Sequence, residues 1–402
     1  MSKHPGARIA RELTARGAVQ DPAWHRALLA VPREAFVPDT VWAPSKDQPG
    51  HEQPYTRDTP EYQRWIHQDV ALVTQVDDGT PAGPGGLGLV PTSSISQPSL
   101  VVAMLEALDA ADGDRVLEIG TGTGYNTALL CERFGDANVV SIEVDAAVAE
   151  QARQNLHALD YKPTLITGDG ATPADEGTFD RVLSTVAARR TVPPAWLRQV
   201  RPGGTVVTPW GPGFTSACLV RLTVGADGSA CGRLLGDAAF MWLRDQRRPV
   251  APWHTFVTED DPAAVDGETG VNPRVVSDRH PGWGVVLGHL VPDLAYASFD
   301  ADPDDPTAAG EATVYVYDRA GSWALGEYTP AGGPYETRRC GPRDLWAEIA
   351  EARGVWEAAG RPGRDRLGLR INSIGRRALW VDEPVTGDLW MSPKLVCGDF
   401  SW

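Results

Sequence analysis

The sequence predicts an α/β protein in which a Rossmann-like, doubly wound parallel sheet is followed by a second, α+β unit. Helical and strand patterns alternate from Gln97 to Gly211, which is typical of a parallel sheet with helices on both faces. After about Phe214 the pattern changes to short β-like runs broken by Gly, Pro and Asp. Because 402 residues exceed one average domain, we expect two domains, residues 1–213 and 214–402.

The elements of the first domain can be assigned in order. Apolar residues spaced three and four apart predict two N-terminal helices in "ARIARELTARG" and "PAWHRALLAV". Residues 44–91 are rich in Pro, Gly, Asp and Gln, so we expect a long ordered loop or lid there. The following pattern predicts helix Gln97–Leu108, strand Arg115–Glu118, a helix after Gly124, strand Val139–Glu143, helix Ala146–Leu159, strands Thr164–Thr167 and Arg181–Thr185, helix Pro194–Val200 and strand Thr205–Thr208.

The second half is richer in tryptophan than the first. Its β-like runs are "SACLVRLTV", "GWGVVLGHL", "ATVYVYDRA", "RLGLRI" and "ALWVDE", and one helix is expected near Asp344–Ala359. Most of the chain's 14 tryptophans lie there. We expect most of them to be core residues, with the alternative that a minority line a peptide groove.

Composition excludes several classes of protein. The net charge is −16, the wrong sign for neutralising nucleic-acid phosphates. No run approaches the roughly 20 apolar residues of a membrane span, and a charged N-terminus does not resemble a signal peptide, so a cytoplasmic location is expected. Cys131, Cys218, Cys231, Cys340 and Cys397 lie far apart, which indicates reduced, mostly structural cysteines and no metal site.

The stretch "VLEIGTGTGYN" predicts a cofactor-binding loop between a strand and a helix. Its glycines, Gly120, Gly122 and Gly124, allow a tight turn and a close approach to a ligand. Glu143 ends the next strand, where an acidic residue suits the ribose hydroxyls of NAD or S-adenosylmethionine. Glu118 would face a cationic or amino-acid group of the ligand and would repel a pyrophosphate, and Asp169 can accept a hydrogen bond from an adenine amino group. This set favours S-adenosylmethionine over NAD, and we expect Thr92, Tyr125, Asn126 and Gly170 to join it.

Several motifs also resemble protein-L-isoaspartate O-methyltransferases over approximately residues 5–212. They occur in the order "VPREAFVP", "SSISQPSLVVAMLEAL", "RVLEIGTGTGYNTALL", "VVSIEVD", "GDG", "FDRVLSTVAA" and "RPGGTVVTPWG". The resemblance implies a class I S-adenosylmethionine-dependent methyltransferase fold, S-adenosylmethionine as donor with S-adenosylhomocysteine as product, and a peptide carboxylate as acceptor. It also implies that Ser96 is the catalytic serine of the family's TIS(Q/A)P segment. Ser94 replaces the usual threonine, and Asp69 occupies the place of an acidic residue in relatives.

The second half resembles the C-terminal extension of actinobacterial members, some of which are associated with ribosomally made lanthipeptide, lasso or graspetide precursors. That resemblance implies methylation of an Asp in a modified precursor peptide, with the ester closing to a succinimide (aspartimide) and then isoAsp. Our main interpretation is such a tailoring enzyme, and the alternative is a general isoaspartyl repair methyltransferase. Two further alternatives are a module that binds S-adenosylmethionine without turnover and a small-molecule O-methyltransferase.

The serines and the acidic residue near them allow two interpretations each. A carboxylate is ionised near pH 7, so methyl transfer to it requires positioning and the exclusion of water rather than a general base. Ser96 is expected to contact the acceptor or the donor's amino-acid part, with Ser94 in support; alternatively, one serine only caps the helix that follows. Asp69 either orients the substrate backbone or caps a loop.

Overall fold

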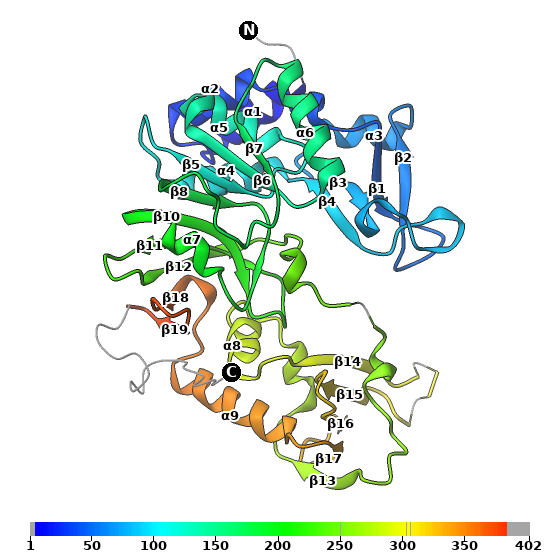
Figure 1. Ribbon diagram of the computed structural model, residues 1–402. Coiled ribbons are helices and arrows are strands. Elements are labelled where there is room, and N and C mark those ends of the chain that lie inside the picture. The colour runs from blue at the N-terminus through cyan, green and yellow to red at the C-terminus, as the bar shows by residue number, and fades with distance from the viewer. Residues whose placement is uncertain (1–4, 250, 303, 306, 384–402) are drawn as a thin grey trace.

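The computed structural model of the chain describes residues 5–249, 251–302, 304–305 and 307–383 (Figure 1). Within these residues the strands form three sheets: a central sheet of ten strands, an N-terminal sheet of four and a C-terminal sheet of five. The expected alternation of helices and strands in the first half is confirmed, with most boundaries within two residues of the prediction.

The central sheet contains the parallel strands that the sequence predicts. Its order is β19-β18-β12-β11-β10-β8-β5-β6-β7, and the short β9 pairs with β10. Strands β10, β8, β5, β6 and β7 are mutually parallel, whereas β11, β12, β18 and β19 extend the sheet antiparallel. The bounds are β5 Val116–Ile119, β6 Val139–Glu143, β7 Thr164–Thr167, β8 Phe179–Ser184, β9 Ala188–Arg189, β10 Val200–Gly211, β11 Cys218–Val224, β12 Ala230–Asp237, β18 Leu367–Ile371 and β19 Arg377–Val381.

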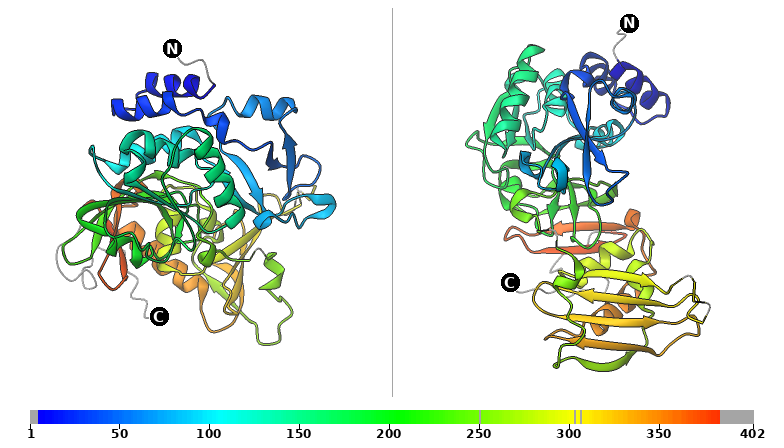
Figure 2. Two further views of the ribbon diagram at one scale, coloured as in Figure 1. Left: turned by 45° about the horizontal axis from the view of Figure 1, so that its top comes forward. Right: turned by 90° about the vertical axis from the view of Figure 1, so that its right-hand side faces the viewer.

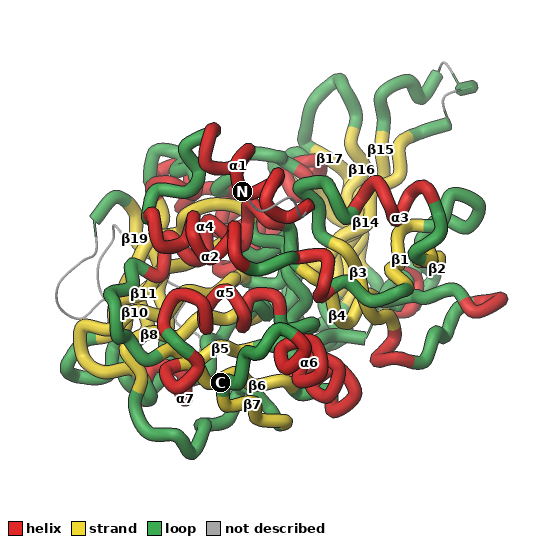
Figure 3. Tube along the Cα trace, turned by 90° about the horizontal axis from the view of Figure 1, so that it is seen from above, coloured by secondary structure: helices red, strands yellow, loops and turns green. Residues whose placement is uncertain are grey.

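Helices cover both faces of this sheet, because alternate residues of each strand point to opposite sides. One apolar cluster joins a face of the sheet to the helices α1 Pro5–Ala15, α2 Pro22–Ala30, α4 Pro98–Leu108, α5 Tyr125–Phe134 and α6 Ala146–Ala158 (Figure 3). A second cluster joins the other face to α7 Pro194–Arg198 and, beyond it, to the C-terminal unit. The sheet is therefore doubly wound.

The segment predicted as a long loop or lid, residues 44–91, differs from that expectation. It belongs to a small antiparallel sheet of order β2-β1-β3-β4, with β1 Thr40–Pro44, β2 Glu52–Thr56, β3 Leu72–Val76, β4 Pro91–Ile95 and the short helix α3 Pro60–Trp65. Each strand has only five residues, so its buried apolar positions, such as Tyr55 and Leu72, give too short an alternation to stand out in the sequence. Strand β4 leads directly into the "SISQP" segment.

The C-terminal unit is α+β, as predicted, with one error in its elements. It comprises β13 Val265–Thr269, β14 Ala295–Asp300, β15 Ala312–Tyr317, β16 Trp323–Tyr328 and β17 Tyr335–Cys340 in the order β13-β17-β16-β15-β14, with helices α8 Trp283–Leu290 and α9 Leu345–Ala358 (Figure 2). The run "GWGVVLGHL", predicted to be β-like, forms α8. This prediction was wrong because a short, continuously apolar run does not distinguish a buried strand from a buried helix.

The central sheet continues past the predicted boundary between residues 213 and 214. Strands β11, β12, β18 and β19 all follow that boundary in the sequence and yet extend the same sheet, with the hairpin β18–β19 lying between the rest of the central sheet and the C-terminal sheet (Figure 2). One apolar cluster also runs from Val206 of β10 to Trp346 and Trp356 of α9. The division into two domains stays a prediction, and the two parts share a sheet and a core.

Most tryptophans of the second half are core residues, which agrees with the simpler expectation for them. Trp283, Trp323, Trp346, Trp356 and Trp380 are buried. Trp390, Trp402 and Cys397 lie outside the described residues.

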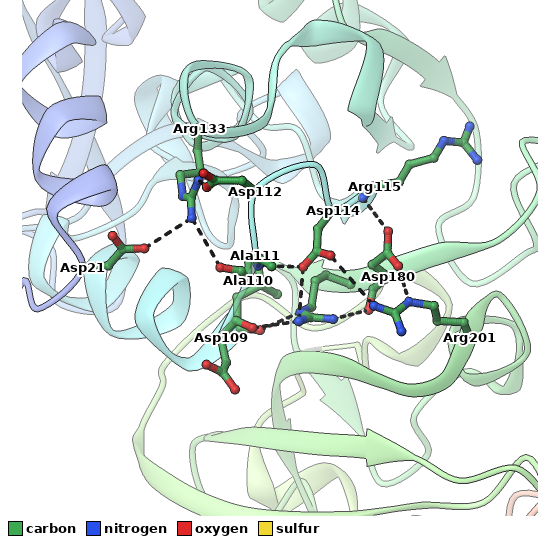
Figure 4. A network of polar contacts seen from close by, with 12 residues as sticks. Asp21, Asp109, Ala110, Ala111, Asp112, Asp114, Arg115, Arg133, Asp180 and Arg201 are labelled. Carbon is green, nitrogen blue, oxygen red and sulfur yellow. Dashed lines mark hydrogen bonds and ion pairs between the residues drawn. The ribbon is translucent and has the colours of Figure 1, made fainter.

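A network of arginines and aspartates lies at the amino ends of the parallel strands (Figure 4). The Asp180 carboxylate accepts a hydrogen bond from the Arg115 backbone at 2.7 Å and also contacts Arg201, and Arg181 pairs with Asp114 at 3.1 Å. Ligands bind at the opposite, carboxyl ends of such strands. This network therefore ties β5, β8 and β10 together and lies away from the site described next.

Candidate active site

A cavity opens at the carboxyl ends of β5, β6 and β8, where an open parallel sheet binds its ligand. Its empty volume is about 950 Å³, open mouth included, which is within the range of small-molecule sites. The sequence-predicted residues that line it are Thr92, Ser94, Ser96, Gly120, Gly122, Tyr125, Asn126, Glu143, Asp169 and Gly170. The structure thus brings ten of the predicted side chains and loop positions into one place, while Asp69, Glu118 and Gly124 lie outside the lining.

The glycine loop has the backbone conformation that the sequence implies. Gly120 has φ +91°, and a Cβ there would lie 2.7 Å from the Thr185 hydroxyl. Gly122 has φ +55° and faces the "SISQP" segment, since a Cβ on it would lie 3.5 Å from the Ser94 carbonyl oxygen. Larger residues at either position would need a strained backbone, and at Gly120 they would also clash.

Glu143 connects the loop to the next strand. One of its carboxylate oxygens accepts a hydrogen bond from the Gly122 backbone at 2.9 Å, and the other accepts one from the Asp145 backbone at 3.0 Å. These two bonds fix the carboxylate at the cavity wall, and each oxygen retains a lone pair that can accept from a ligand hydroxyl. The position therefore suits a ribose, as expected from the end of the second strand.

Glu118 does not face the cavity, which corrects the expectation that it contacts a donor directly. Its side chain points to the opposite face of β5, where it accepts hydrogen bonds from Asn126 at 2.6 Å, Thr127 at 2.5 Å and Ser141 at 2.6 Å. Burial raises the pKa of Glu118 to about 7, although these three hydrogen bonds lower it. Glu118 therefore supports the start of α5 and orients Asn126, which does line the cavity.

Gly124 and Tyr125 support the loop at the start of α5. Gly124 is the N-terminal cap residue of α5 and packs against Leu156. Tyr125 is buried beside Phe36, with a ring-centroid distance of 5.8 Å, and burial raises the pKa of its hydroxyl to about 12. Asp169, another residue of the cavity lining, is exposed and accepts a hydrogen bond from the Ala171 backbone at 2.9 Å.

Ser94 and Ser96 line the same cavity as Glu143, and neither caps the following helix. The N-cap residue of α4 is Gln97, which makes no capping hydrogen bond with its side chain. Ser94 donates to the Met241 sulfur at 3.7 Å. The Ser96 hydroxyl makes no hydrogen bond to any described residue and lines the cavity. The alternative that one serine is only a helix cap is therefore excluded, and the Ser96 hydroxyl is available to a ligand.

Asp69 takes the capping role instead. Its carboxylate accepts a hydrogen bond from the Ser99 backbone at 2.8 Å, at the first turn of α4, and Asp69 is not part of the cavity lining. Asp69 thus has a capping role, at the N-terminus of α4 rather than in a loop, and the Ser99 N–H is not available to a substrate. Nearby, the buried Arg33 of "VPREAFVP" donates to the carbonyl oxygens of Val70 and Ser96 at 2.9 and 3.2 Å. Asp69 and Arg33 together hold the "SISQP" segment in position.

Sequence reasoning missed one wall of the cavity, which comes from the second half of the chain. Residues 241–244 and Arg247 line it, and the Ala187 backbone exchanges hydrogen bonds with Met241 and Leu243 at 2.7 and 2.9 Å. Arg247 and Arg244 pair with Asp78 at 2.8 and 3.0 Å. Asp78 follows β3, so this ion-pair link connects the N-terminal sheet to two arginines of the second half that line the cavity. The "RDQRR" run was its only sequence signal.

No described helix is long and apolar enough to cross a membrane. Within the described ranges, no group of three or more His, Cys, Asp or Glu side chains is arranged to hold a metal ion.

Comparisons with known proteins agree with this geometry. The family model described as "Protein-L-isoaspartate(D-aspartate) O-methyltransferase (PCMT)" matches residues 68–248, which include both the glycine loop and the cavity wall at residues 241–247. A protein-L-isoaspartate O-methyltransferase of Ignicoccus hospitalis is 34% identical over 206 residues, which is 50% of this chain and 79% of the relative. One from Methylorubrum extorquens is 37% identical over 216 residues, covering 54% and 77%.

A solved structure titled "Protein-L-isoaspartate O-methyltransferase" shares the fold over nearly the whole chain. It covers 94% of this chain and 99% of its own, with a TM-score of 0.53 and 19% identity. The C-terminal unit thus has a structural counterpart in that protein. With a central sheet of the class I S-adenosylmethionine-dependent methyltransferase type and two relatives that match over more than three quarters of their length, the chain belongs to the protein-L-isoaspartate (D-aspartate) O-methyltransferase family.

Proposed function

We propose that the protein is a general protein-L-isoaspartate O-methyltransferase, which transfers a methyl group from S-adenosylmethionine to the free carboxylate of isoaspartyl residues in peptides and proteins. The observation that carries this proposal is the Ser96 hydroxyl, which has no partner among the described residues and lies in the same cavity as the glycine loop and Glu143. Family membership supports the same reaction.

The residues around the cavity fit the methyl donor. Glu143 has lone pairs for the ribose hydroxyls, Asp169 and Gly170 lie where an adenine would be held, and the Gly120–Gly122 backbone leaves room for close approach. When bound, S-adenosylmethionine supplies an electrophilic methyl group on a sulfonium. Thr92 and Asn126 complete the lining near these residues.

The chain's own residues would then position the acceptor. An isoaspartyl carboxylate is ionised near pH 7 and needs no general base. Ser96 donates a hydrogen bond to this carboxylate, and Ser94 supports the segment through its contact with Met241. Trp242 and Leu243 contribute apolar side chains to the cavity lining, and the exclusion of water by such groups would strengthen the effect of positioning. The methyl ester has a far better leaving group than the carboxylate, so attack by the neighbouring amide closes a succinimide.

Methyl transfer from labelled S-adenosylmethionine tests this proposal. Peptides with isoAsp should be methylated, and the same peptides with Asp should be poor acceptors. Ser96→Ala should lower kcat/KM for the peptide by about tenfold or more while S-adenosylhomocysteine binds as before, because a hydrogen bond to a charged group is lost. Ser99→Ala, a neighbouring serine outside the cavity lining, is the matched control. Equal acceptance of Asp and isoAsp, or normal activity of Ser96→Ala, would contradict the proposal.

A second candidate is the tailoring of a ribosomally made precursor peptide at an Asp residue, with a succinimide or isoAsp as end product. In its favour, the second half of the chain lines the same cavity as Ser96, through residues 241–244 and Arg247. Against it, a structural counterpart of the C-terminal unit exists in a protein titled as an isoaspartate methyltransferase. Tailoring would be favoured if the protein methylates an Asp-containing precursor peptide but no generic isoaspartyl peptide. If it methylates neither, a module that only binds the donor would be favoured.

A further inference from the structure

Three arginines contact a single carboxylate where the central sheet and its connections lie against the C-terminal unit. Asp293 Oδ1 lies 2.9 Å from Arg190 Nη1 and 3.8 Å from Arg189 Nη2, and Arg248 contacts the same oxygen. A further carboxylate near Arg248, that of Asp318, is already paired with Arg343 at 2.9 Å. Arg189 and Arg248 therefore share the single carboxylate of Asp293, an excess of one positive charge for these three side chains, in a chain whose net charge is −16.

This excess charge is partly withdrawn from water. The Arg189 side chain is only 11% exposed, and its guanidinium makes no hydrogen bond to any described residue. Burial, and then repulsion by neighbouring arginines, lowers the pKa values of both Arg189 and Arg248 to about 10. Part-buried N–H donors that lack a hydrogen bond raise the free energy of the folded protein, and repulsion between like charges raises it further. A bound anion would offset both.

The cluster lies next to the active-site cavity. Val186 lines the cavity, and Arg189 follows three residues later, so their Cα atoms are at most about 11 Å apart. Gln246 accepts a hydrogen bond from the Arg189 backbone at 2.5 Å, and Arg247, which lines the cavity, directly precedes Arg248 in the chain. An extended peptide advances about 3.3 Å per residue and would cover this distance in about three to five residues.

We propose that Arg189 and Arg248, with Asp293 as their internal counterion, form an anion subsite for a carboxylate of the peptide substrate. The subsite takes an Asp or Glu side chain, or the chain's own terminal carboxylate, three to five residues from the methyl acceptor. Guanidinium groups suit this ligand because their planar N–H donors match a carboxylate. This inference rests on the proposed function and adds a preference for acidic isoaspartyl peptides.

Paired isoaspartyl peptides test the preference. They carry Glu or Gln at three to five residues on either side of isoAsp and are otherwise identical. At one of these spacings, the wild-type protein should methylate the Glu peptide with a kcat/KM about tenfold higher than that of the matching Gln peptide. The difference should come from a lower KM for the Glu peptide. Arg189→Gln and Arg248→Gln should each abolish the difference while leaving the Gln peptide unaffected. Arg361→Gln changes an exposed arginine that pairs with Glu357 and not with Asp293, and this matched control should keep the preference.

A variant in the opposite direction separates binding from structural effects. Asp293→Asn removes the internal counterion and should increase the preference for the Glu peptide, whereas a merely structural role for these residues would reduce activity on both peptides alike.

Equal kcat/KM for the Glu and Gln peptides with wild-type protein would overturn the proposal. Inorganic phosphate provides a second check. If phosphate raises the Tm of the wild-type protein but not of Arg189→Gln, and the peptides show no preference, the cluster holds a free anion and the proposal is overturned. If no isoaspartyl peptide is methylated, the proposed function fails. In that case, peptide binding measured by fluorescence anisotropy, with S-adenosylhomocysteine present, tests the anion subsite separately. Tighter binding of the Glu peptide than of the Gln peptide to the wild-type protein, lost in Arg189→Gln, supports the subsite. Equal binding of the two peptides refutes it.

Discussion

Replacing Glu118 by glutamine exchanges a fully buried carboxyl group for an uncharged amide of the same shape. Burial raises the pKa of Glu118 from 4.5 to about 7 in the folded protein. In the unfolded chain the group returns to its ordinary value. Because the folded pKa is the higher one, the stabilising contribution of this group is complete below pH 4.5 and is lost as the pH rises through 7.

The two pKa values give the size of the effect. A separation of about 2.5 units (7 minus 4.5) corresponds to about 3 kcal/mol of unfolding free energy. Roughly 2.5 kcal/mol of this lies between pH 5 and pH 8, because at pH 5 the unfolded carboxyl is already mostly ionised. The glutamine variant has no such ionisation at this position. Its lost hydrogen bonds from Thr127 and Ser141 set a constant offset at every pH.

Urea unfolding of both proteins, followed by tryptophan fluorescence at pH 5, 6, 7 and 8, measures this difference. The unfolding free energy of Glu118→Gln minus that of the wild type should rise by about 2.5 kcal/mol from pH 5 to pH 8. Glu351→Gln, which changes an exposed carboxyl group on α9, should show no such rise. If the difference for Glu118→Gln is the same at all four pH values, the argument from burial is wrong.

Three other substitutions have defined outcomes. Glu143→Ala should weaken S-adenosylhomocysteine binding by at least tenfold in calorimetry, because charge-assisted hydrogen bonds to ribose hydroxyls are lost; unchanged affinity would contradict this role. Gly120→Ala should lower the unfolding free energy by about 1–3 kcal/mol, owing to its positive φ and the contact with Thr185; wild-type stability would refute the strain. Asp78→Asn should raise the KM for the methyl donor only a few-fold at low salt, because the ion pairs of Asp78 with Arg247 and Arg244 are half-exposed. If this increase in KM does not depend on the salt concentration, its cause is not ionic.

The parts of the site that the sequence predicts are those encoded by local patterns. The turn between β5 and α5 requires glycine at positive φ, and Glu143 ends the next strand of the same β-α-β unit. The glycine turn and Glu143 lie close together because both stand at the carboxyl ends of adjacent parallel strands, which the fold class already implies. The Ser96 segment was predictable because it directly precedes a helix that packs on the same sheet.

The parts that were missed depend on contacts between distant residues or on the direction of one side chain. Met241 reaches Ser94 across 147 positions of the sequence, and no local pattern indicates that contact. Glu118 was expected to face the donor, but the alternation along a four-residue strand turns it toward Ser141. The helix α8 was missed for a different reason, since a short apolar run has the same composition as a buried strand.

The hairpin β18–β19 has a consequence for how the protein is made. Strand β12 pairs with β18, so the edge of the central sheet stays open during synthesis until the ribosome has produced the C-terminal unit and Leu367–Ile371. The C-terminal unit is thus inserted in the sheet rather than appended to its end, and it is attached at both of its ends. A chain cut after residue 213 would leave β10 as an unprotected, aggregation-prone edge, so the two halves are expected to be produced and to fold only as one piece.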